Sequence, residues 1–205
     1  MKKSDQTKEN LLKCAEKAFS KKGYYETQVS DIVEMAGVAK GTIYQYFSNK
    51  EAIFKILLSH YLRDWEKAIA VNMNDYGGKN PGIYYAQEYL RHRLKKTSDF
   101  FRENQDRTNI ILRIAVGVNK SFETIVRSFE DKVLNVIIND IELGQRWGHI
   151  SRDFDLDITC NAVLGAVLRL SYYYFVLKRK KLSQTEQDAL QNEIFKLVSN
   201  TLKMG

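Results

Sequence analysis

Hydrophobic residues recur every three or four positions along most of this chain, which is the spacing that places side chains on one face of a helix. The first stripe comprises five residues: Leu11, Leu12, Ala15, Ala18 and Phe19. Ser4 or Asp5 can cap the start of this helix. Gly23 follows two lysines, and cations before a glycine are typical of a helix C-terminus. The pattern therefore predicts a helix over residues 4–22.

Three more helices are predicted before the first clear loop. The second is short, starting at Thr27 or Gln28 and ending at Gly37. A third, also short, covers about residues 40–46. A fourth covers residues 49–69 and begins at an asparagine that can cap its first turn. The chain is therefore predicted to be helical from near its start to about residue 69.

Residues 72–82 form the one clear loop, because two adjacent glycines are followed there by Asn-Pro-Gly. Beyond this loop the sequence shows only helical stripes. They cover five segments: 83–101, 110–118, 122–144, 156–177 and 184–203. The sequence contains no strand-like alternation, internal repeat or low-complexity tract. It therefore predicts an all-α fold of about nine helices.

Composition and charge change this picture little. Of the 205 residues, 44% are hydrophobic and 28% are charged, which is typical of a folded globular protein. The formal net charge of +7 is compatible with a polyanionic partner, but many ordinary cytosolic proteins share such an excess. Charge alone therefore does not identify a nucleic-acid-binding protein, and a motif is needed beside it.

Catalytic, metal and cofactor chemistry find little support in the sequence. Cys14 and Cys160 are far apart in apolar helical stretches, so we expect small buried hydrophobes, with a redox sensor as the alternative. The three histidines are scattered, so no metal site is predicted. No nucleophile–base pair, carboxylate pair or phosphate-binding loop occurs at a meaningful spacing. We therefore expect neither enzymatic activity nor a cofactor.

One apolar segment, residues 158–177, is long enough to span a bilayer. Its single charged residue is Arg169, and a central arginine costs ~2.5–3.5 kcal/mol on insertion scales. A helix buried between protein partners fits this segment better. The N-terminal lysines precede no apolar run, unlike those of a secretory signal. We therefore expect a cytoplasmic protein without a membrane partner.

The strongest functional signal is carried by residues 29–51, VSDIVEMAGVAKGTIYQYFSNKE. A short helix, a tight turn at Gly37 and a second short helix make a helix-turn-helix, whose second helix enters the DNA major groove. Gly37 suits a left-handed turn, which costs other residues ~1–2 kcal/mol. Ile43 and Phe47 are expected to face a small core, and the opposite face is largely polar. The motif predicts a sequence-specific DNA-binding protein.

This stretch resembles the DNA-binding domain of the TetR family of bacterial repressors. The resemblance rests on Gly23-Tyr24, Thr27, Ile32, Ala36, Gly37-Val38, Lys40-Gly41-Thr42-Ile43-Tyr44, Tyr46-Phe47 and Lys50-Glu51. It covers less than a quarter of the chain. Gln45-Tyr46 departs from the family, where a histidine often precedes the phenylalanine, and this concerns the choice of operator. The resemblance implies a three-helix DNA-binding domain over residues 1–50 and a larger helical effector-binding and dimerisation domain over residues 51–205.

The resemblance also implies roles for single residues in DNA binding. Lys40 and Lys50 would contact phosphates, and Thr42 and Gln45 would reach base edges. The remaining contact positions are Thr27, Gln28, Gly41, Tyr44 and Tyr46. The two tyrosines would lie against the DNA backbone and thymine methyls. Thr27 and Gln28 would hold phosphates at the amide-rich start of the second helix. A core position for Tyr44 and a merely solvated Lys50 are the alternatives.

Residues 156–203 are predicted to form a homodimer interface, because a helix that is apolar on all sides needs a partner from another subunit as well as its own. TetR relatives dimerise through their last two helices, and this region resembles that pair. The run Lys178-Arg179-Lys180-Lys181 falls at a helix C-terminus. We interpret it as compensation of the helix dipole, with a phosphate contact as the alternative.

The aromatic residues between these two regions predict a small-molecule pocket between helices. Its candidate lining residues are Trp65, Tyr89, His92, Phe101, Arg113, Phe122, Trp147, Arg169 and Tyr173. His92, Arg113 and Arg169 could orient a polar or anionic end of the ligand. The alternative for each is an ordinary salt bridge or a satisfied core group. Residues 142–150 and 155–166 resemble the corresponding region of fatty-acyl-CoA-responsive members, so the expected effector is a fatty-acyl or other hydrophobic compound.

These observations lead to one principal hypothesis. The chain would be a dimeric repressor that binds double-stranded DNA at an inverted-repeat operator and is released by a small lipophilic ligand. The rival hypothesis is a structural or partner-recruiting DNA-binding protein that has the same fold and no effector.

Overall fold

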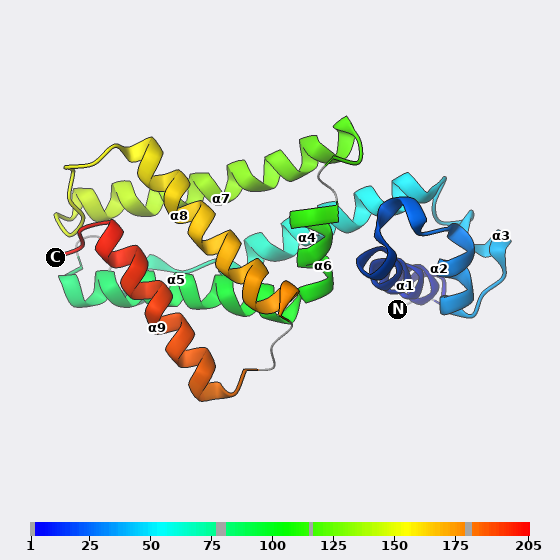
Figure 1. The fold of residues 1–205 in the computed structure, drawn as a ribbon, viewed down its shortest axis with the longest axis horizontal. Helices are drawn as coiled ribbons and strands as arrows, with labels where there is room; N and C mark the ends of the chain where they lie inside the picture. Colours follow the sequence, from blue (N-terminus) through cyan, green and yellow to red (C-terminus); the bar gives the residue numbers. More distant parts are fainter. Residues whose placement is uncertain (1–2, 77–80, 115–116, 179–181) are drawn as a thin grey trace. The chain divides into compact units, whose positions relative to one another are not determined.

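The computed structural model of this protein describes residues 3–76, 81–114, 117–178 and 182–205. The regular secondary structure of these residues is helical. The α-helices are α1 (Lys3–Glu26), α2 (Val29–Ala36), α3 (Lys40–Ile43), α4 (Lys50–Ile69), α5 (Ile83–Glu103), α6 (Gln105–Asn109), α7 (Lys120–Arg146), α8 (Leu156–Ser171) and α9 (Gln184–Thr201) (Figure 1). The described ranges contain no strand. The predicted all-α fold of about nine helices is therefore confirmed.

The chain divides into two compact units. The head unit combines Met1–Asp64 with Asn104–Ser128, and the C-terminal unit combines Trp65–Glu103 with Phe129–Gly205. Helices α4 and α7 each contribute residues to both units. The assignment of DNA binding to residues 1–50 and of effector binding and dimerisation to residues 51–205 stays a prediction. The compactness of a unit does not show which residues bind DNA or an effector.

Aromatic side chains from three helices form the core of the head unit. The rings of Phe19 and Phe54 meet edge to face with 4.9 Å between their centroids, and Phe122 lies 4.7 Å from Phe54. Tyr24 lies 5.0 Å from Phe54 and 5.1 Å from Phe122. Pairs of this kind contribute about 0.5–1.5 kcal/mol each beyond their buried area. The cluster therefore holds α1 and α4 against the first turns of α7.

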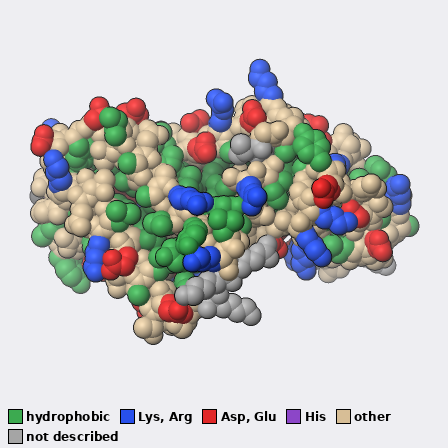
Figure 2. All heavy atoms as spheres, viewed as in Figure 1, with side chains coloured by type: hydrophobic (Ala, Val, Ile, Leu, Met, Phe, Trp, Pro, Cys, Tyr) green, Lys and Arg blue, Asp and Glu red, His purple; other side chains and the backbone are tan. Residues whose placement is uncertain are grey.

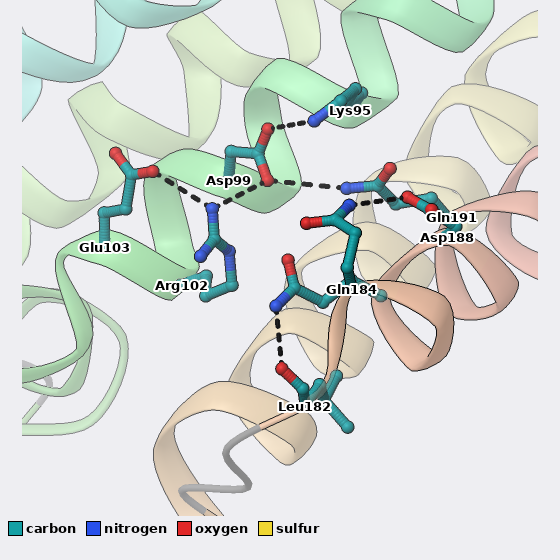
Figure 3. A network of polar contacts seen from close by, with 9 residues as sticks. Lys95, Asp99, Arg102, Glu103, Leu182, Gln184, Asp188 and Gln191 are labelled. Atoms are coloured by element: carbon teal, nitrogen blue, oxygen red, sulfur yellow. Dashed lines mark hydrogen bonds and ion pairs between the residues drawn. The ribbon is translucent and has the colours of Figure 1, made fainter.

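The C-terminal unit is a layered bundle in which α9 packs against α5 and α8, and α8 also packs against α5. Trp65, at the end of α4, meets Phe129 of α7 edge to face at 5.3 Å. A polar network joins α5 to the start of α9 (Figure 3). There Asp99 accepts hydrogen bonds from Lys95 at 2.6 Å, Arg102 at 3.1 Å and Gln191 at 3.4 Å. Lys95 and Arg102 belong to α5 like Asp99 itself, so they hold the carboxylate in place, and the Gln191 bond alone links this carboxylate to α9.

Several element boundaries differ from the predicted ones. α3 ends at Ile43 instead of about residue 46, because the next main-chain hydrogen bonds span three residues and make a turn. The predicted loop at 72–82 contains a 3-10 turn, η1 (Met73–Tyr76). The stripe predicted at 110–118 is π-helical over η2 (Ile110–Ile114), and the end of the stripe predicted at 156–177 is π-helical over η3 (Tyr172–Leu177).

Two further expectations concern residues singled out in the sequence. In the cation run after η3, residues 179–181 lie outside the described residues, whereas Lys178 is exposed with its ammonium 4.7 Å from the ring of Tyr173. Cys14 and Cys160 are both buried, as predicted. Burial also raises the pKa of both thiols. Because the reactive form is the thiolate, this environment disfavours the redox-sensor alternative.

Candidate functional site

The turn between α2 and α3 is built by one glycine and two buried side chains. Gly37 has the left-handed conformation (φ 67°, ψ 33°), and its N–H donates to the Glu34 carbonyl at 3.1 Å. Chain reversal there lets α3 return across α2. Ile43 and Phe47 are buried and anchor the second helix and the turn after it. The predicted helix-turn-helix geometry is therefore present.

The anchoring leaves the opposite face of α3 open to solvent. Lys40, Gly41 and Gln45 are exposed, Thr42 is partly exposed, and Tyr44 has 52% of its surface accessible. A core position for Tyr44, which the sequence left open, is thereby excluded. The face presents a cation, a hydroxyl, an amide and a phenol within six residues. These groups can bind phosphates and base edges of a nucleic acid.

Tyr46 and Gln28, two further predicted contact residues, each take part in a defined hydrogen bond. Tyr46 is half-buried, and its hydroxyl accepts a hydrogen bond from the Ser4 hydroxyl at 3.4 Å. Gln28 is exposed at the start of α2, and its main-chain N–H donates to the Asp31 carboxylate at 2.8 Å. That hydrogen bond and an ion pair with Lys22 at 2.9 Å lower the pKa of Asp31. A charged carboxylate at this helix start is stabilised by the helix dipole.

The structure gives Thr27 and Lys50 internal partners. Thr27 is completely buried, and its hydroxyl donates to the carbonyls of Gly23 at 2.6 Å and Ala18 at 3.2 Å. Its hydroxyl is therefore not a group that phosphate can reach, which leaves only the main chain of this position for such a contact. The Lys50 ammonium donates to carbonyls at the end of α1, and burial lowers its pKa. The phosphate contacts of both residues stay predictions.

The C-terminal unit contains a cavity of about 80 Å³. Its walls come from the end of α4 and from α5, α7, α8 and α9, and they consist mostly of valine, leucine, isoleucine and aromatic side chains. Three of the nine predicted pocket residues line it: Trp65, Tyr89 and Trp147. The indole N–H of Trp65 is buried without a hydrogen-bond partner in the described structure. A concave, mostly apolar cavity with a few polar groups is the usual form of a small-molecule site.

The other six predicted residues do not line this cavity. Arg113 and Phe122 belong to the head unit, where Phe122 is part of the aromatic core. Arg169 is exposed on α8, and the ring of Tyr173 packs at 5.2 Å against Tyr174. Phe101 is buried away from the cavity, and the His92 ring is hydrogen-bonded to the Tyr76 hydroxyl. An aromatic count along the sequence does not separate core from cavity, because both are apolar.

Two charged residues that line the cavity are not among the nine residues predicted from the sequence. Arg93 of α5 and Asp140 of α7 form an ion pair at 3.1 Å, each with less than a fifth of its side chain exposed. Burial raises the pKa of the Asp140 carboxyl, and the Arg93 guanidinium opposes that rise. A signal existed, since each residue occupies a helix-face position within an apolar stripe, four residues after Tyr89 and Val136 respectively. One base and one acid inside such stripes indicate a buried pair.

Comparison with known proteins agrees with this geometry. The family model described as bacterial regulatory proteins, tetR family, matches residues 11–57, which include the whole helix-turn-helix. Over these residues the chain has the DNA-binding domain of the TetR family of bacterial regulatory proteins. The HTH-type transcriptional repressor NicS of Pseudomonas putida is 25% identical over 173 residues, covering 83% of this chain and 76% of NicS.

Solved structures of bacterial regulatory proteins share the fold over nearly the whole chain. A bacterial regulatory protein of the tetR family from Rhodococcus RHA1 superposes with a TM-score of 0.76 and 15% identity, covering all of both chains. The transcriptional regulator FadR of Bacillus subtilis, solved in complex with stearoyl-CoA, gives a TM-score of 0.71 at 23% identity. The match covers 93% of this chain and 96% of FadR. These likenesses show that the C-terminal helices as well as the head have the TetR fold.

Proposed function

We propose that this TetR-family protein is a cytoplasmic, dimeric transcriptional repressor that binds an inverted-repeat operator and is released from it by a small lipophilic ligand. The observation that carries the proposal is the exposed polar face of α3, held outward by the buried side chains of Ile43 and Phe47. A helix presented in this way fits the DNA major groove. Repression is the role that the name of NicS assigns to that relative.

Within the head we assign base reading to Thr42 and Gln45, and phosphate contact to Lys40. Tyr44 would lie along the DNA backbone, because its phenol is exposed at the end of α3. The N–H groups at the start of α2, next to Gln28, would hold a further phosphate. Affinity from these few cations should fall steeply as salt rises, because each neutralised phosphate releases counterions.

An apolar surface on α8 and α9 supports pairing with a second copy of the chain. Ile158 is 70% exposed and Leu197 47% exposed, and Ala162 and Gly165 add small exposed positions that permit close helix approach. Figure 2 shows hydrophobic side chains gathered over this part of the C-terminal unit. Half-sites one helical turn apart need two linked heads. The surface therefore fits the predicted interface within residues 156–203.

A membrane is the other environment that could cover this surface. The helix Leu156–Leu177 is long and apolar enough to cross a bilayer, and 33% of its most apolar window is buried within the chain. Arg169 lies exposed in that helix, and a central arginine opposes insertion by about 2.5–3.5 kcal/mol. A second protein chain can instead solvate or pair the guanidinium at the rim of an interface. We therefore assign the surface to the dimer.

The cavity supports a ligand-controlled repressor over the effector-independent alternative. Closely packed interiors have few voids larger than one water molecule, whereas this void is several times that size. Arg93, at its wall, also donates to the carbonyl of Ile69, the last residue of α4, at 2.6 Å. α4 begins in the head unit. A ligand that moves Arg93 would thus shift the C-terminal end of α4, and the N-terminal residues of the same helix are part of the head unit.

Genomic footprinting of the purified protein tests this function. We expect protected sites that are inverted repeats and that lose protection when a lipophilic ligand is added. Protection that no compound changes would favour the structural DNA-binding alternative. The absence of any preferred site would contradict both, and turnover of a substrate that survives Thr42→Ala and Lys40→Ala would instead indicate an enzyme.

A further inference from the structure

The cavity wall holds a hydrogen-bonded cluster of a tyrosine, an arginine and an aspartate, in which the arginine and the aspartate neutralise each other. The Tyr89 hydroxyl donates to Asp140 Oδ1 at 2.6 Å, and Arg93 Nε donates to Asp140 Oδ2 at 3.1 Å. Arg93 Nη2 donates to Asp140 Oδ1 at 3.3 Å and also to the Tyr89 hydroxyl. All three residues line the cavity. We refer to them as the Tyr89–Arg93–Asp140 cluster.

The cluster uses its charged groups internally. Both carboxylate oxygens of Asp140 have donors, and each guanidinium nitrogen of Arg93 has an acceptor, the third being the Ile69 carbonyl. The opposite charges lie side by side, so their fields largely cancel at the cavity. The remaining lining residues of the described cavity carry no charge. A ligand therefore meets a neutral, largely hydrocarbon surface.

We propose that this cavity takes an uncharged, mostly hydrocarbon ligand and rejects free carboxylates and ammonium compounds. The inference rests on the proposed ligand-controlled function and specifies the class of its effector. Four of the five guanidinium N–H groups of Arg93 already donate, so an anion that formed a full ion pair with Arg93 would take N–H groups from Asp140. Asp140 would then be a buried charge without its partner, which is among the costliest arrangements in a protein. A cation would strand Arg93 in the same way.

An uncharged ligand meets no such penalty. It gains from leaving water and from contact with the valine and leucine walls, roughly in proportion to its apolar area. Size sets a second condition, because the void is about 80 Å³ and an engineered cavity of roughly 150 Å³ is known to hold one benzene ring. A ring-sized ligand must therefore spread the surrounding helices somewhat. Single-ring compounds are accordingly the suitable probes.

The test compares toluene, benzoate and benzylamine, which share one ring and differ in charge at pH 7. Binding to the full chain without DNA is measured by the rise of its thermal unfolding midpoint with probe concentration. We expect toluene to bind and the two charged probes to bind at least about tenfold more weakly. Val163→Phe, which fills the void from α8, should abolish the toluene effect and so place the site.

Asp140→Asn tests whether the paired charges cause the rejection of anions. It leaves the Arg93 charge without its carboxylate, so benzoate affinity should rise at least about tenfold while toluene affinity changes little. Glu142→Gln is the matched control, because it removes an exposed carboxylate from the same helix and should leave all three affinities unchanged. If Asp140→Asn does not fold, as judged by circular dichroism, the comparison of probes on the unmodified protein decides alone.

Two results would overturn the proposal: benzoate or benzylamine binding the unmodified protein as tightly as toluene, or no toluene binding at all. Operator affinity is measured separately by footprinting. A failure confined to probe selectivity would leave the DNA-binding function intact, whereas loss of operator recognition with intact selectivity would contradict the repressor and retain the ligand class.

Discussion

The side-chain ammonium of Lys50 lies 2.8 Å from the carbonyl oxygen of Tyr24. It also donates to the Thr27 carbonyl at 2.9 Å and lies 4.4 Å from the centre of the Tyr24 ring. These carbonyls follow the break of α1 at Gly23, where helical hydrogen bonding is interrupted. Lys50 is the first residue of α4. One lysine thus closes the end of α1 onto the start of α4.

This contact predicts a structural cost for Lys50→Met. Carbonyls left without their charged donor should lower the free energy of unfolding by about 1–3 kcal/mol, measured by urea denaturation. Lys55→Met, on the exposed side of the same helix, serves as the control. The salt dependence of operator binding then tests the phosphate contact. A slope reduced by about one unit would support that contact, and unchanged stability would contradict the structural role.

Substitutions on the exposed face of α3 and of the turn after it test base reading. Thr42→Ala and Gln45→Ala should each cost about 1–3 kcal/mol of binding to the preferred site and relax the preference at one position of each half-site. Ser59→Ala changes an exposed residue of α4 outside this face and should leave operator affinity unchanged. Equal binding by all three variants, measured by fluorescence anisotropy, would show that another surface reads the bases.

Gly37 predicts a purely conformational effect. A Cβ placed there meets no atom within 4 Å, so any cost of substitution comes from the backbone conformation. Gly37→Ala should destabilise the head by about 1–2 kcal/mol, whereas Gly37→Asn should cost less because asparagine tolerates the left-handed region. Thermal unfolding of both variants measures the difference. Equal costs would mean that the turn changes conformation in the variants.

The exposed apolar surface of α8 and α9 predicts the effect of charge on dimerisation. Ile158→Glu combined with Leu197→Glu should raise the dimer dissociation constant at least about tenfold, which corresponds to ~1.4 kcal/mol, as measured by analytical ultracentrifugation. Tyr84→Glu is the matched control, because Tyr84 is similarly exposed (67%) but lies on α5. A dimer that tolerates both glutamates would place the interface elsewhere.

The lowered pKa of Asp31 predicts how the head responds to acid. The folded state holds this carboxylate ionised through the Gln28 N–H and Lys22, so its folded pKa lies below its unfolded one. Its contribution to stability is therefore complete above the unfolded pKa and is lost as pH falls through the folded pKa. Asp31→Asn should lower the unfolding midpoint at neutral pH and converge with the unmodified protein in acid. A difference that persists undiminished in acid would assign the effect to packing.

Local signals predicted the head well, and long-range contacts explain what they missed. Gly37, Asn49 and the helical stripes each act within a few residues, so α2 and the start of α4 could be placed from sequence. The partners of Lys50 lie more than twenty residues away, and those of Arg93 lie on α4 and α7. A base and an acid within apolar stripes indicate that a buried pair exists, but no local pattern identifies which distant residues are the partners. Aromatic positions were likewise assigned to a pocket although Phe122 belongs to the core of the head.

Base reading by a dimer is tested by selecting binding sites from random duplex DNA. The purified protein should enrich an inverted repeat whose half-sites lie about one helical turn apart. Thr42→Ala and Gln45→Ala should change the enriched bases while the half-site spacing is retained. Enrichment of no sequence, or of the same sequence by the unmodified protein and both variants, would contradict a dimer that reads DNA through α3.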